Sequence, residues 1–361
     1  MTDVVIIGGG VIGLSAAFEL AESGLSVRVL EQGTPGREAS WAGAGMLPPG
    51  NPDVATGPEP LLRGHSHCRW PEWVARTTAR SGIDPEYARC GSLEIPLDSD
   101  PSEFKNQIAT WESEGVAVEL LTRSQLHEHH YFLSDDITSA YRLPECGQVR
   151  NPRLLKSLMM ACESLRAPII TGQPVIGFYW NGDRILAART ASEVYTADHF
   201  VIAGGAWSGG LLQQLGLDIP IKPIRGQIVL LEQRSLPFRC VLQSGSRYLV
   251  PRRDGRILVG ATEEDVGFLK ANTSGGVQGL LEFATRLVPS LRRAEFERCW
   301  SGLRPYREGG LPLIGRSPRA RNVVIATGHF RAGLQLSPVT AVLVRQLVCG
   351  QPTLLPVEWF A

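Results

Sequence analysis

The fold of this 361-residue chain is decided by its first stretch, Val4-Val5-Ile6-Ile7-Gly8-Gly9-Gly10-Val11-Ile12-Gly13. The apolar run predicts a buried strand, and the turn Gly8-x-Gly10-x-x-Gly13 leads into residues 12–23, which have helical spacing. A second apolar run over residues 25–31 ends in Glu31. Strand, glycine turn, helix and a second strand with a terminal acid make up the dinucleotide-binding βαβ unit.

Each residue of this unit has a physical role. Gly8 permits a tight turn, Gly10 lets a pyrophosphate approach the backbone, and Gly13 lets the helix pack against the strand. The helix N-terminus offers N–H groups and a partial positive charge to phosphates. Glu31 can accept hydrogen bonds from ribose hydroxyls. The sequence therefore predicts that the N-terminal segment binds a dinucleotide.

Composition narrows the class of protein further. The 36 basic and 36 acidic residues cancel, so the chain as a whole attracts neither nucleic acid nor an anionic membrane. The 7 cysteines form no C-x-x-C pair, which predicts reduced thiols in a cytoplasmic protein. There is no apolar stretch of about 20 residues, so no membrane span is expected. The N-terminus lacks the basic start of a secretory signal. A homo-oligomer is compatible with the sequence.

The order of the expected elements predicts how the domains are arranged. Dinucleotide-binding elements occur at the start of the chain, near the middle and at the end, with mixed and β-rich pieces between them. We therefore expect an α/β fold, α+β overall. A discontinuous Rossmann-like domain would contain residues 1–82, 151–221 and 301–361. A substrate domain on a mixed antiparallel sheet would contain residues 83–150 and 222–300.

The sequence also predicts local structure in three segments. Asn151 is expected to cap the helix that begins with Pro152. Residues 175–197 are expected to form a strand pair. The stretch Ala39–Leu47 is too small and too apolar for a solvated loop, which indicates backbone lying against a ligand; a plain surface loop is the alternative.

With these motifs in hand, the chain resembles the glycine oxidase and D-amino acid oxidase family of FAD flavoproteins, and within it the glycine oxidases of the thiamine pathway. The resemblance implies an FAD-binding domain, a substrate domain whose sheet covers the flavin, and oxidation of an amine on the carbon next to a carboxylate. The matching segments are Gly8–Gly13, Glu31, Ala39–Leu47, Val201–Ser208, Tyr248–Thr262, Gly302–Pro305 and Gly328–Arg331.

The resemblance also implies which residues contact the cofactor. Because residues 303–316 contain no cysteine, we expect FAD to be held without a covalent bond. The implied cofactor residues are Gly8, Gly10, Val11, Ile12, Gly13, Glu31, Gln32, Ala39, Ser40, Ala44, Gly45, Met46, Val175, Ala203, Gly204, Trp207, Gly328, His329, Phe330, Arg331, Ala332, Gly333, Leu334 and Gln335.

For the substrate, the resemblance implies Arg304, Tyr248 and Arg331. A planar, always charged guanidinium suits a carboxylate, and the Tyr248 hydroxyl can donate to the same group. Glu263 stands where some glycine oxidases have an apolar residue: either it points away, or the site is more polar. Trp41 stands where smaller residues are common, which would crowd the flavin entrance.

The implied reaction passes a hydride from a small amino acid to flavin N5, with no acid or base from the protein. Reoxidation by O₂ gives hydrogen peroxide, and glycine would give glyoxylate and ammonia, or an imine for thiamine synthesis. A dehydrogenase that passes electrons to a quinone or carrier, a D-amino acid oxidase of other specificity and a non-catalytic flavoprotein are the alternatives. An NAD enzyme would not need Ala39–Leu47.

The histidines at 65–67 and 127–130 match no zinc pattern, so no metal is expected.

Overall fold

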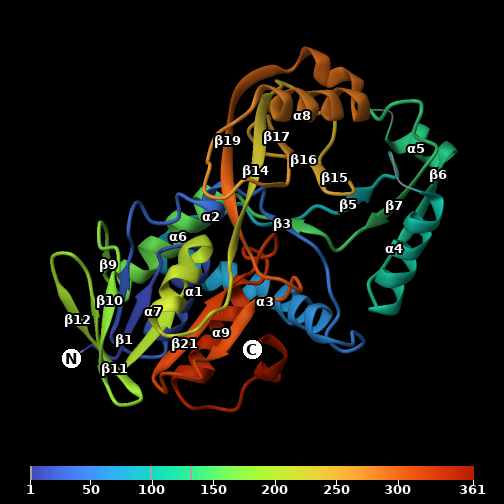
Figure 1. Ribbon diagram of the computed structural model, residues 1–361. Coiled ribbons are helices and arrows are strands. Elements are labelled where there is room, and N and C mark those ends of the chain that lie inside the picture. The colour runs from blue at the N-terminus through green and yellow to red at the C-terminus, as the bar shows by residue number, and fades with distance from the viewer. Residues whose placement is uncertain (1, 98–99, 131) are drawn as a thin grey trace.

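A six-stranded sheet built on the N-terminal strand forms the lower half of the molecule in Figure 1. The computed structural model describes residues 2–97, 100–130 and 132–361. All neighbouring strands of this sheet run parallel except β20, which is antiparallel to β21. In order across the sheet the strands are β20 (Leu313–Arg316), β21 (Val323–Thr327), β13 (His199–Ile202), β1 (Val4–Ile7), β2 (Val27–Leu30) and β9 (Ile169–Ile170).

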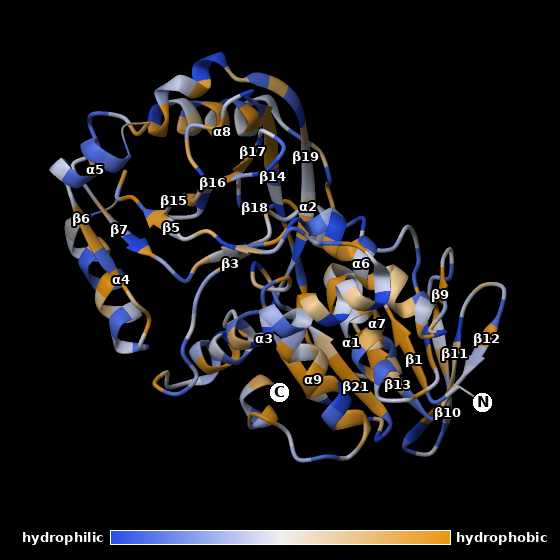
Figure 2. Cartoon of the chain, turned by 180° about the vertical axis from the view of Figure 1, so that it is seen from behind, coloured by the Kyte–Doolittle hydropathy of each residue, from blue (hydrophilic) through white to orange (hydrophobic). Residues whose placement is uncertain are grey.

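Both faces of this sheet are covered, and the period-two pattern of β1 shows how. Val4 and Ile6 pack into the core beneath the helices, whereas Val5 and Ile7 belong to the core on the other face. Figure 2 shows these central strands in the orange of apolar residues. The helices on the first face are α1 (Val11–Glu22), α3 (Pro58–Ser81), α6 (Asn151–Ser164) and α9 (Ser337–Val348). The other face carries α7 (Ser208–Gln214) and a sheet of β10 (Gly177–Asn181), β11 (Arg184–Arg189) and β12 (Val194–Thr196).

A second, nine-stranded sheet forms the upper half of the molecule in Figure 1. It is mixed, because β5 runs parallel to β15 while the other neighbours are antiparallel. Its strands, in order, are β18 (Glu264–Asp265), β14 (Lys222–Glu232), β17 (Arg256–Gly260), β16 (Arg247–Pro251), β15 (Val241–Ser244), β5 (Ser92–Glu94), β7 (Ser139–Leu143) and β6 (Glu119–Thr122), with β19 (Glu295–Tyr306) on the other side of β14.

The two faces of this second sheet have different tasks. Val229 and Leu231 pack against helix α8 (Ser274–Leu287), which covers the outer face. Ile228 and Leu230 alternate with them and lie in a separate apolar cluster with Tyr248. Because side chains alternate along a strand, one face of β14 builds the domain core and the other is free to face the first sheet.

The remaining elements connect the halves or extend the edge. A small sheet of β3 (Met46–Leu47), β8 (Gly147–Gln148) and β4 (Ala88–Arg89) lies between them, next to helix α2 (Ala39–Ala42). Helices α4 (Pro101–Ser113) and α5 (Arg123–His129) lie at the far edge in Figure 1. In the described part of the chain, no helix combines the length and the apolar character needed to cross a bilayer.

The expected α/β class, with a Rossmann-like sheet and a mixed antiparallel sheet, is confirmed, but two local predictions are wrong. Asn151 does not cap α6: Arg150 is the N-cap residue without a side-chain cap bond, and the Asn151 side chain instead donates to the Ser40 carbonyl at 2.9 Å. Residues 175–197 contain the three strands of β10–β12, not a pair. The division into domains stays a prediction; β19 is continuous through its proposed boundary at 300/301.

Candidate active site

A cavity of about 550 Å³ lies where the two sheets face each other. We call it the central cavity. Glycine turns and short loops after β1, β2 and β13 supply its wall on the Rossmann side. Because these strands are parallel, their carboxyl ends meet at one edge, which is where ligands bind in open α/β sheets. Strands β14, β16 and β19 supply the opposite wall.

The turn after β1 is closed by contacts that only glycine permits. Gly8 has φ +115°, and a Cβ there would stand 2.3 Å from the Ala203 carbonyl oxygen. A Cβ on Gly13 would stand 1.9 Å from the carbonyl oxygen of Gly8. Gly10 is the N-cap residue of α1, and the Val11 N–H behind it donates to Ser40 Oγ at 2.9 Å. The start of α1 therefore reaches the central cavity with its positive dipole end, which suits an anionic ligand.

The acid after β2 is held in place by the same turn. The Gly9 N–H donates to Glu31 Oε2 at 2.7 Å, and the Gly33 N–H donates to Oε1 at 2.8 Å. Each carboxylate oxygen has a further lone pair, so Glu31 can still accept from a ligand. Its place on the cavity wall suits the hydroxyls of a ribose.

The segment of small residues, 39–47, packs on both of its sides. Ala39, Ser40, Ala44 and Met46 line the central cavity. On the other side Gly45 has φ +74°, and a Cβ there would stand 2.0 Å from the Val149 carbonyl oxygen. The small residues are therefore required by the neighbouring protein backbone as well as by the cavity. From the sequence alone these two reasons for small residues could not be told apart.

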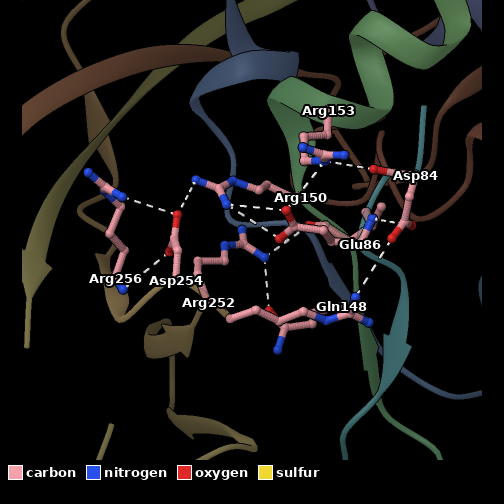
Figure 3. A network of polar contacts seen from close by, with 10 residues as sticks. Asp84, Glu86, Gln148, Arg150, Arg153, Arg252, Asp254 and Arg256 are labelled. Carbon is pink, nitrogen blue, oxygen red and sulfur yellow. Dashed lines mark hydrogen bonds and ion pairs between the residues drawn. The ribbon is translucent and has the colours of Figure 1, made fainter. Parts of the chain in front are cut away.

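A buried arginine of the second sheet fastens this segment. Arg252 is only 6% exposed, and it donates to Gln148 Oε1 at 2.8 Å and to the Ala44 carbonyl at 2.6 Å. Burial lowers the pKa of Arg252 to about 10, so it remains a cation at neutral pH. Figure 3 shows the group next to a second cluster, in which Asp254 pairs with Arg150 at 2.7 Å. Arg252 thus joins the substrate-side sheet to the wall of the cavity.

The loop after β21 brings a buried histidine to the wall. His329 is 3% exposed and its Nε2 lies 3.1 Å from Thr340 Oγ1. Burial lowers its pKa to about 3, so the ring is neutral. Farther on, the Gln335 side chain donates to the Pro48 carbonyl at 2.8 Å. This loop and the start of α9 are therefore rigidly tied to the segment that precedes α3.

At the opposite wall, the chain places a cation on the surface of a strand. Arg304 of β19 donates through Nη1 to the Thr262 carbonyl at 3.0 Å. Its guanidinium lies on Gly226 of β14, where a Cβ would stand 2.3 Å from both terminal nitrogens. The remaining donors of the guanidinium are available to a carboxylate, which matches its planar fork.

Tyr248 lies in the same wall, and it too is positioned by packing against a glycine of the neighbouring strand. It pairs with Gly260 across β16 and β17, and a Cβ on Gly260 would stand 2.6 Å from the Tyr248 hydroxyl oxygen. Burial raises the pKa of Tyr248 above its ordinary value, although Arg304 and Arg331 act in the opposite direction. The hydroxyl is therefore a neutral donor at physiological pH.

The two departures from the family pattern have separate outcomes. Glu263 forms an ion pair with Arg331, and both line the cavity, so Glu263 does not point away. Trp41 is absent from the described cavity wall; its ring packs 5.2 Å from that of Trp300, between Arg37 and Arg298. The expectation that Trp41 crowds the entrance is therefore wrong.

The structure brings together nearly all the predicted site residues. Gly13 and Gly328 are the exceptions; they shape the turns without lining the wall. The predicted residues on the wall are Gly8, Gly10, Val11, Ile12, Glu31, Gln32, Ala39, Ser40, Ala44, Gly45, Met46, Val175, Ala203, Gly204, Trp207, Tyr248, Glu263, Arg304, His329, Phe330, Arg331, Ala332, Gly333, Leu334 and Gln335.

Sequence reasoning missed several wall residues, including Glu38, Asn151, Gly226 and Gln243. A signal that could have found Gly226 is a lone glycine next to the apolar run 228–231, since an isolated glycine in a strand indicates close approach of another group. The buried Oδ1 atom of Asn151 has no hydrogen-bond partner in the described structure, and such an atom on a cavity wall suits a ligand donor. Among the described residues, no three His, Cys, Asp or Glu side chains gather in a way that would hold a metal ion.

This wall fits FAD. The start of α1 suits the pyrophosphate, Glu31 the ribose, and the space beside Val175 the adenine. The flavin would then lie between the segment 44–46, the loop 329–335 and the sheet that carries Tyr248. The donor set on this last wall is cationic and neutral, not metal-binding, which suits a carboxylate substrate.

Comparisons with known proteins agree with this geometry. A family model described as FAD dependent oxidoreductase matches residues 3–347. Glycine oxidase of Pseudomonas putida (strain KT2440) is 35% identical over 358 residues, which cover 99% of this chain and 97% of that protein. The bifunctional protein ThiO/ThiG of Trichormus variabilis is 35% identical over 354 residues, covering 97% of this chain and 53% of that protein. The chain thus spans about half the length of this second relative. The crystal structure of glycine oxidase from Geobacillus kaustophilus superposes with a TM-score of 0.93 at 31% identity, over 99% of this chain and 97% of that one.

Proposed function

The chain belongs to the family of FAD dependent oxidoreductases, and from this premise we propose that it is an oxidase of small amino acids, with glycine as its main substrate. The family that the motifs resemble is thereby confirmed, and with it an enzyme that uses FAD. The names of the relatives, glycine oxidase and ThiO/ThiG, support the choice of substrate.

The Rossmann side of the central cavity would hold the cofactor. Gly10, Val11 and Ile12 line the cavity where they would face the pyrophosphate, and Glu31 would accept from the ribose. The loop 329–335 and the segment 44–46 line it where they would enclose the isoalloxazine ring. The chemistry that bound FAD would supply is acceptance of the hydride of the substrate Cα–H and transfer of both electrons to O₂, giving hydrogen peroxide.

The observation that carries the proposal is the position of Arg304. Its guanidinium lies flat on Gly226 and donates at one edge to the Thr262 carbonyl. The side chain therefore has a fixed orientation, and its other N–H donors point in fixed directions. Tyr248 stands beside it as a neutral hydroxyl donor. Together they hold the carboxylate of an amino acid and leave its α-carbon to face the flavin. This is catalysis by orientation.

The protein supplies no acid or base for the chemical step. The substrate enters with a neutral amine, and loss of the hydride from its α-carbon would leave an iminium ion. Its N–H proton would pass to the solvent, which leaves the imine and balances the proton taken up when O₂ is reduced to hydrogen peroxide. Hydrolysis of the imine of glycine gives glyoxylate and ammonia, whereas the imine itself would be the product useful for thiamine synthesis.

Anaerobic mixing of the purified holoenzyme with glycine, sarcosine, D-alanine and D-proline tests this proposal. We expect the visible flavin bands to bleach fastest with glycine, and oxygen consumption with peroxide release to follow in air. Bleaching without oxygen consumption would make the protein a dehydrogenase with another acceptor. Faster bleaching with D-alanine or D-proline would make it a D-amino acid oxidase, and no bleaching would refute an amino acid substrate.

A variant tests the site. Arg304→Ala should lower kcat/KM for glycine about 100-fold, roughly 3 kcal/mol, because the carboxylate loses a charged, two-point partner. Arg234→Ala, at an exposed arginine after β14, is the matched control and should leave kcat/KM unchanged. Undiminished glycine turnover in Arg304→Ala would show that the carboxylate binds elsewhere.

A further inference from the structure

Arg331 is a second arginine on the substrate side of the central cavity, and its hydrogen-bond partner differs in charge from that of Arg304. Arg304 is bound by the Thr262 carbonyl, a neutral acceptor, and therefore retains its full charge toward the cavity. Arg331 forms an ion pair with the carboxylate of Glu263. On the substrate side of the cavity two arginines thus line the wall, and of these only Arg304 is left with an uncompensated charge by these contacts, whereas Arg37 lines the cavity on the Rossmann side.

Arg331 is held where it stands by the loop that carries it. Its guanidinium lies over the ring of Phe330, 5.2 Å from the centroid. That ring packs edge-on against Tyr306 of β19, with centroids 5.0 Å apart. Both Arg331 and Arg304 act electrostatically on Tyr248, so the two guanidinium groups serve the same part of the cavity. Arg331 is therefore placed to meet a substrate that extends beyond Arg304.

The ion pair with Glu263 prevents Arg331 from binding a second anionic group of the substrate. The side chains of Arg331 and Glu263 are 51% and 37% exposed, which puts the pair at the mouth of the cavity. An anionic group that reaches Arg331 from the inside must share it with Glu263 and stand next to a like charge. Like-charge contacts of this kind are how binding sites reject a wrong partner.

We propose that Glu263 determines specificity: by pairing with Arg331 it restricts the central cavity to amines that carry a single carboxylate. The inference rests on the proposed function, because it deepens the identity of the substrate. Dicarboxylate amines, such as iminodiacetate, would place their second carboxylate beside the Glu263–Arg331 pair. With Glu263 neutralised, Arg331 would become the partner of that group.

The test measures ligand binding, so it does not depend on turnover. Acetate and malonate, with one and two carboxylates, are titrated into the FAD-loaded enzyme while the visible flavin spectrum is recorded. In Glu263→Gln, malonate affinity should rise about tenfold or more, while acetate affinity changes less than about threefold. The matched control is Asp265→Asn, an exposed acid two residues along that removes the same charge and should leave the ratio at its wild-type value.

A double variant identifies the responsible cation. In Glu263→Gln/Arg331→Gln the gain for malonate should disappear, because the released guanidinium is gone. Equal changes for acetate and malonate in Glu263→Gln, a gain that survives loss of Arg331, or a gain of the same size in Asp265→Asn would each overturn the proposal. Because neither ligand is oxidised, these results stand apart from the glycine experiment. Failure to oxidise glycine would refute the proposed function without changing the binding ratio.

Discussion

The guanidinium of Arg304 lies on the Cα atom of Gly226, where a Cβ would come within 2.3 Å of both terminal nitrogens. The pairing of β14 with β19 explains this contact: Ile224 opposes Arg304 and Gly226 opposes Gly302, so Gly226 and Arg304 are diagonal neighbours on one face. The strand lacks a side chain at the place where the cation must lie flat. The direction of Arg304 is therefore set by a residue on the neighbouring strand.

Gly226→Ala should displace Arg304 and weaken carboxylate binding by about 1–3 kcal/mol, because the new methyl group occupies the space of the guanidinium. We expect KM for glycine to rise with little loss of bound FAD. Steady-state kinetics and the ratio of flavin to protein absorbance measure both effects. Gly315→Ala is the matched control, since Gly315 is also in a strand and a Cβ there meets no atom within 4 Å. An unchanged KM in Gly226→Ala would contradict the assigned role of Arg304.

The pH dependence of ligand binding tests Tyr248. Because burial holds its pKa above the ordinary value of 10.0, the hydroxyl should remain a donor throughout the neutral range. Acetate affinity, followed by the flavin spectrum, should therefore show no ionisation of Tyr248 between about pH 6 and pH 9. Tyr248→Phe should weaken acetate roughly 5–20-fold at every pH in this range. A wild-type transition below pH 9 that Tyr248→Phe removes would show that the tyrosine ionises in the working range.

His329 should make the protein less stable in mild acid. Its pKa is about 3 in the folded chain, whereas the ordinary pKa of a histidine is 6.5. Below pH 6.5 the unfolded state therefore binds a proton at this histidine, and the folded state does not. The contribution to stability is full above pH 6.5 and falls as pH decreases toward 3. Between pH 7.5 and pH 5 the loss amounts to about 2 kcal/mol.

Urea unfolding at fixed FAD concentration checks this linkage. His329→Asn should show a smaller drop in unfolding free energy between these pH values than the wild type does. His127→Asn, at a half-exposed position on α5, is the control and should retain the wild-type drop. Equal slopes for the wild type and His329→Asn would mean that His329 is not the proton-linked group.

Arg252 should be a major contributor to stability. Its replacement by Met leaves the Ala44 and Val149 carbonyls and the Gln148 side chain without their buried donor. We expect a loss of about 3–5 kcal/mol in unfolding free energy and weaker FAD binding, because the segment 44–46 loses its anchor. Arg253→Met is the control, since the Arg253 side chain is 63% exposed and forms a long ion pair with Asp84 at 3.7 Å. Urea unfolding and FAD titration of the apoprotein measure the difference; equal stability of the two variants would refute the anchoring role.

Much of the Rossmann side could be predicted because its signals are local. The spacing of Gly8, Gly10 and Gly13 reflects contacts within one turn and one helix, and the acid at position 31 ends the next strand. Arg304 and Tyr248 were found through the resemblance of their segments. The prediction for Asn151 was wrong because its place before Pro152 in the sequence suits a cap, whereas in the structure Arg150 is the N-cap residue and the Asn151 side chain donates to the carbonyl of Ser40, 111 residues away.

Other features depend on contacts between distant segments. Nothing near Trp41 in the chain shows that its ring turns toward Trp300, and nothing near Arg252 shows that it will be buried against Ala44. Both follow from how the second sheet packs on the loops of the first. Side-chain direction on a loop is set by its neighbours in space, which a pattern of period two or of helical spacing does not encode.

The sequence by itself determined the class of protein: a glycine turn between strand and helix leaves few conformations, and it leaves unpaired N–H groups at the helix start, which suit the anionic pyrophosphate of a dinucleotide. Only the tertiary structure decided the charge of the substrate side. Glu263 and Arg331 stand 68 positions apart, and their pairing converts two charged residues into a neutral wall beside Arg304. Charges interact through space and not along the chain, so their sum at a site is a property of the folded molecule.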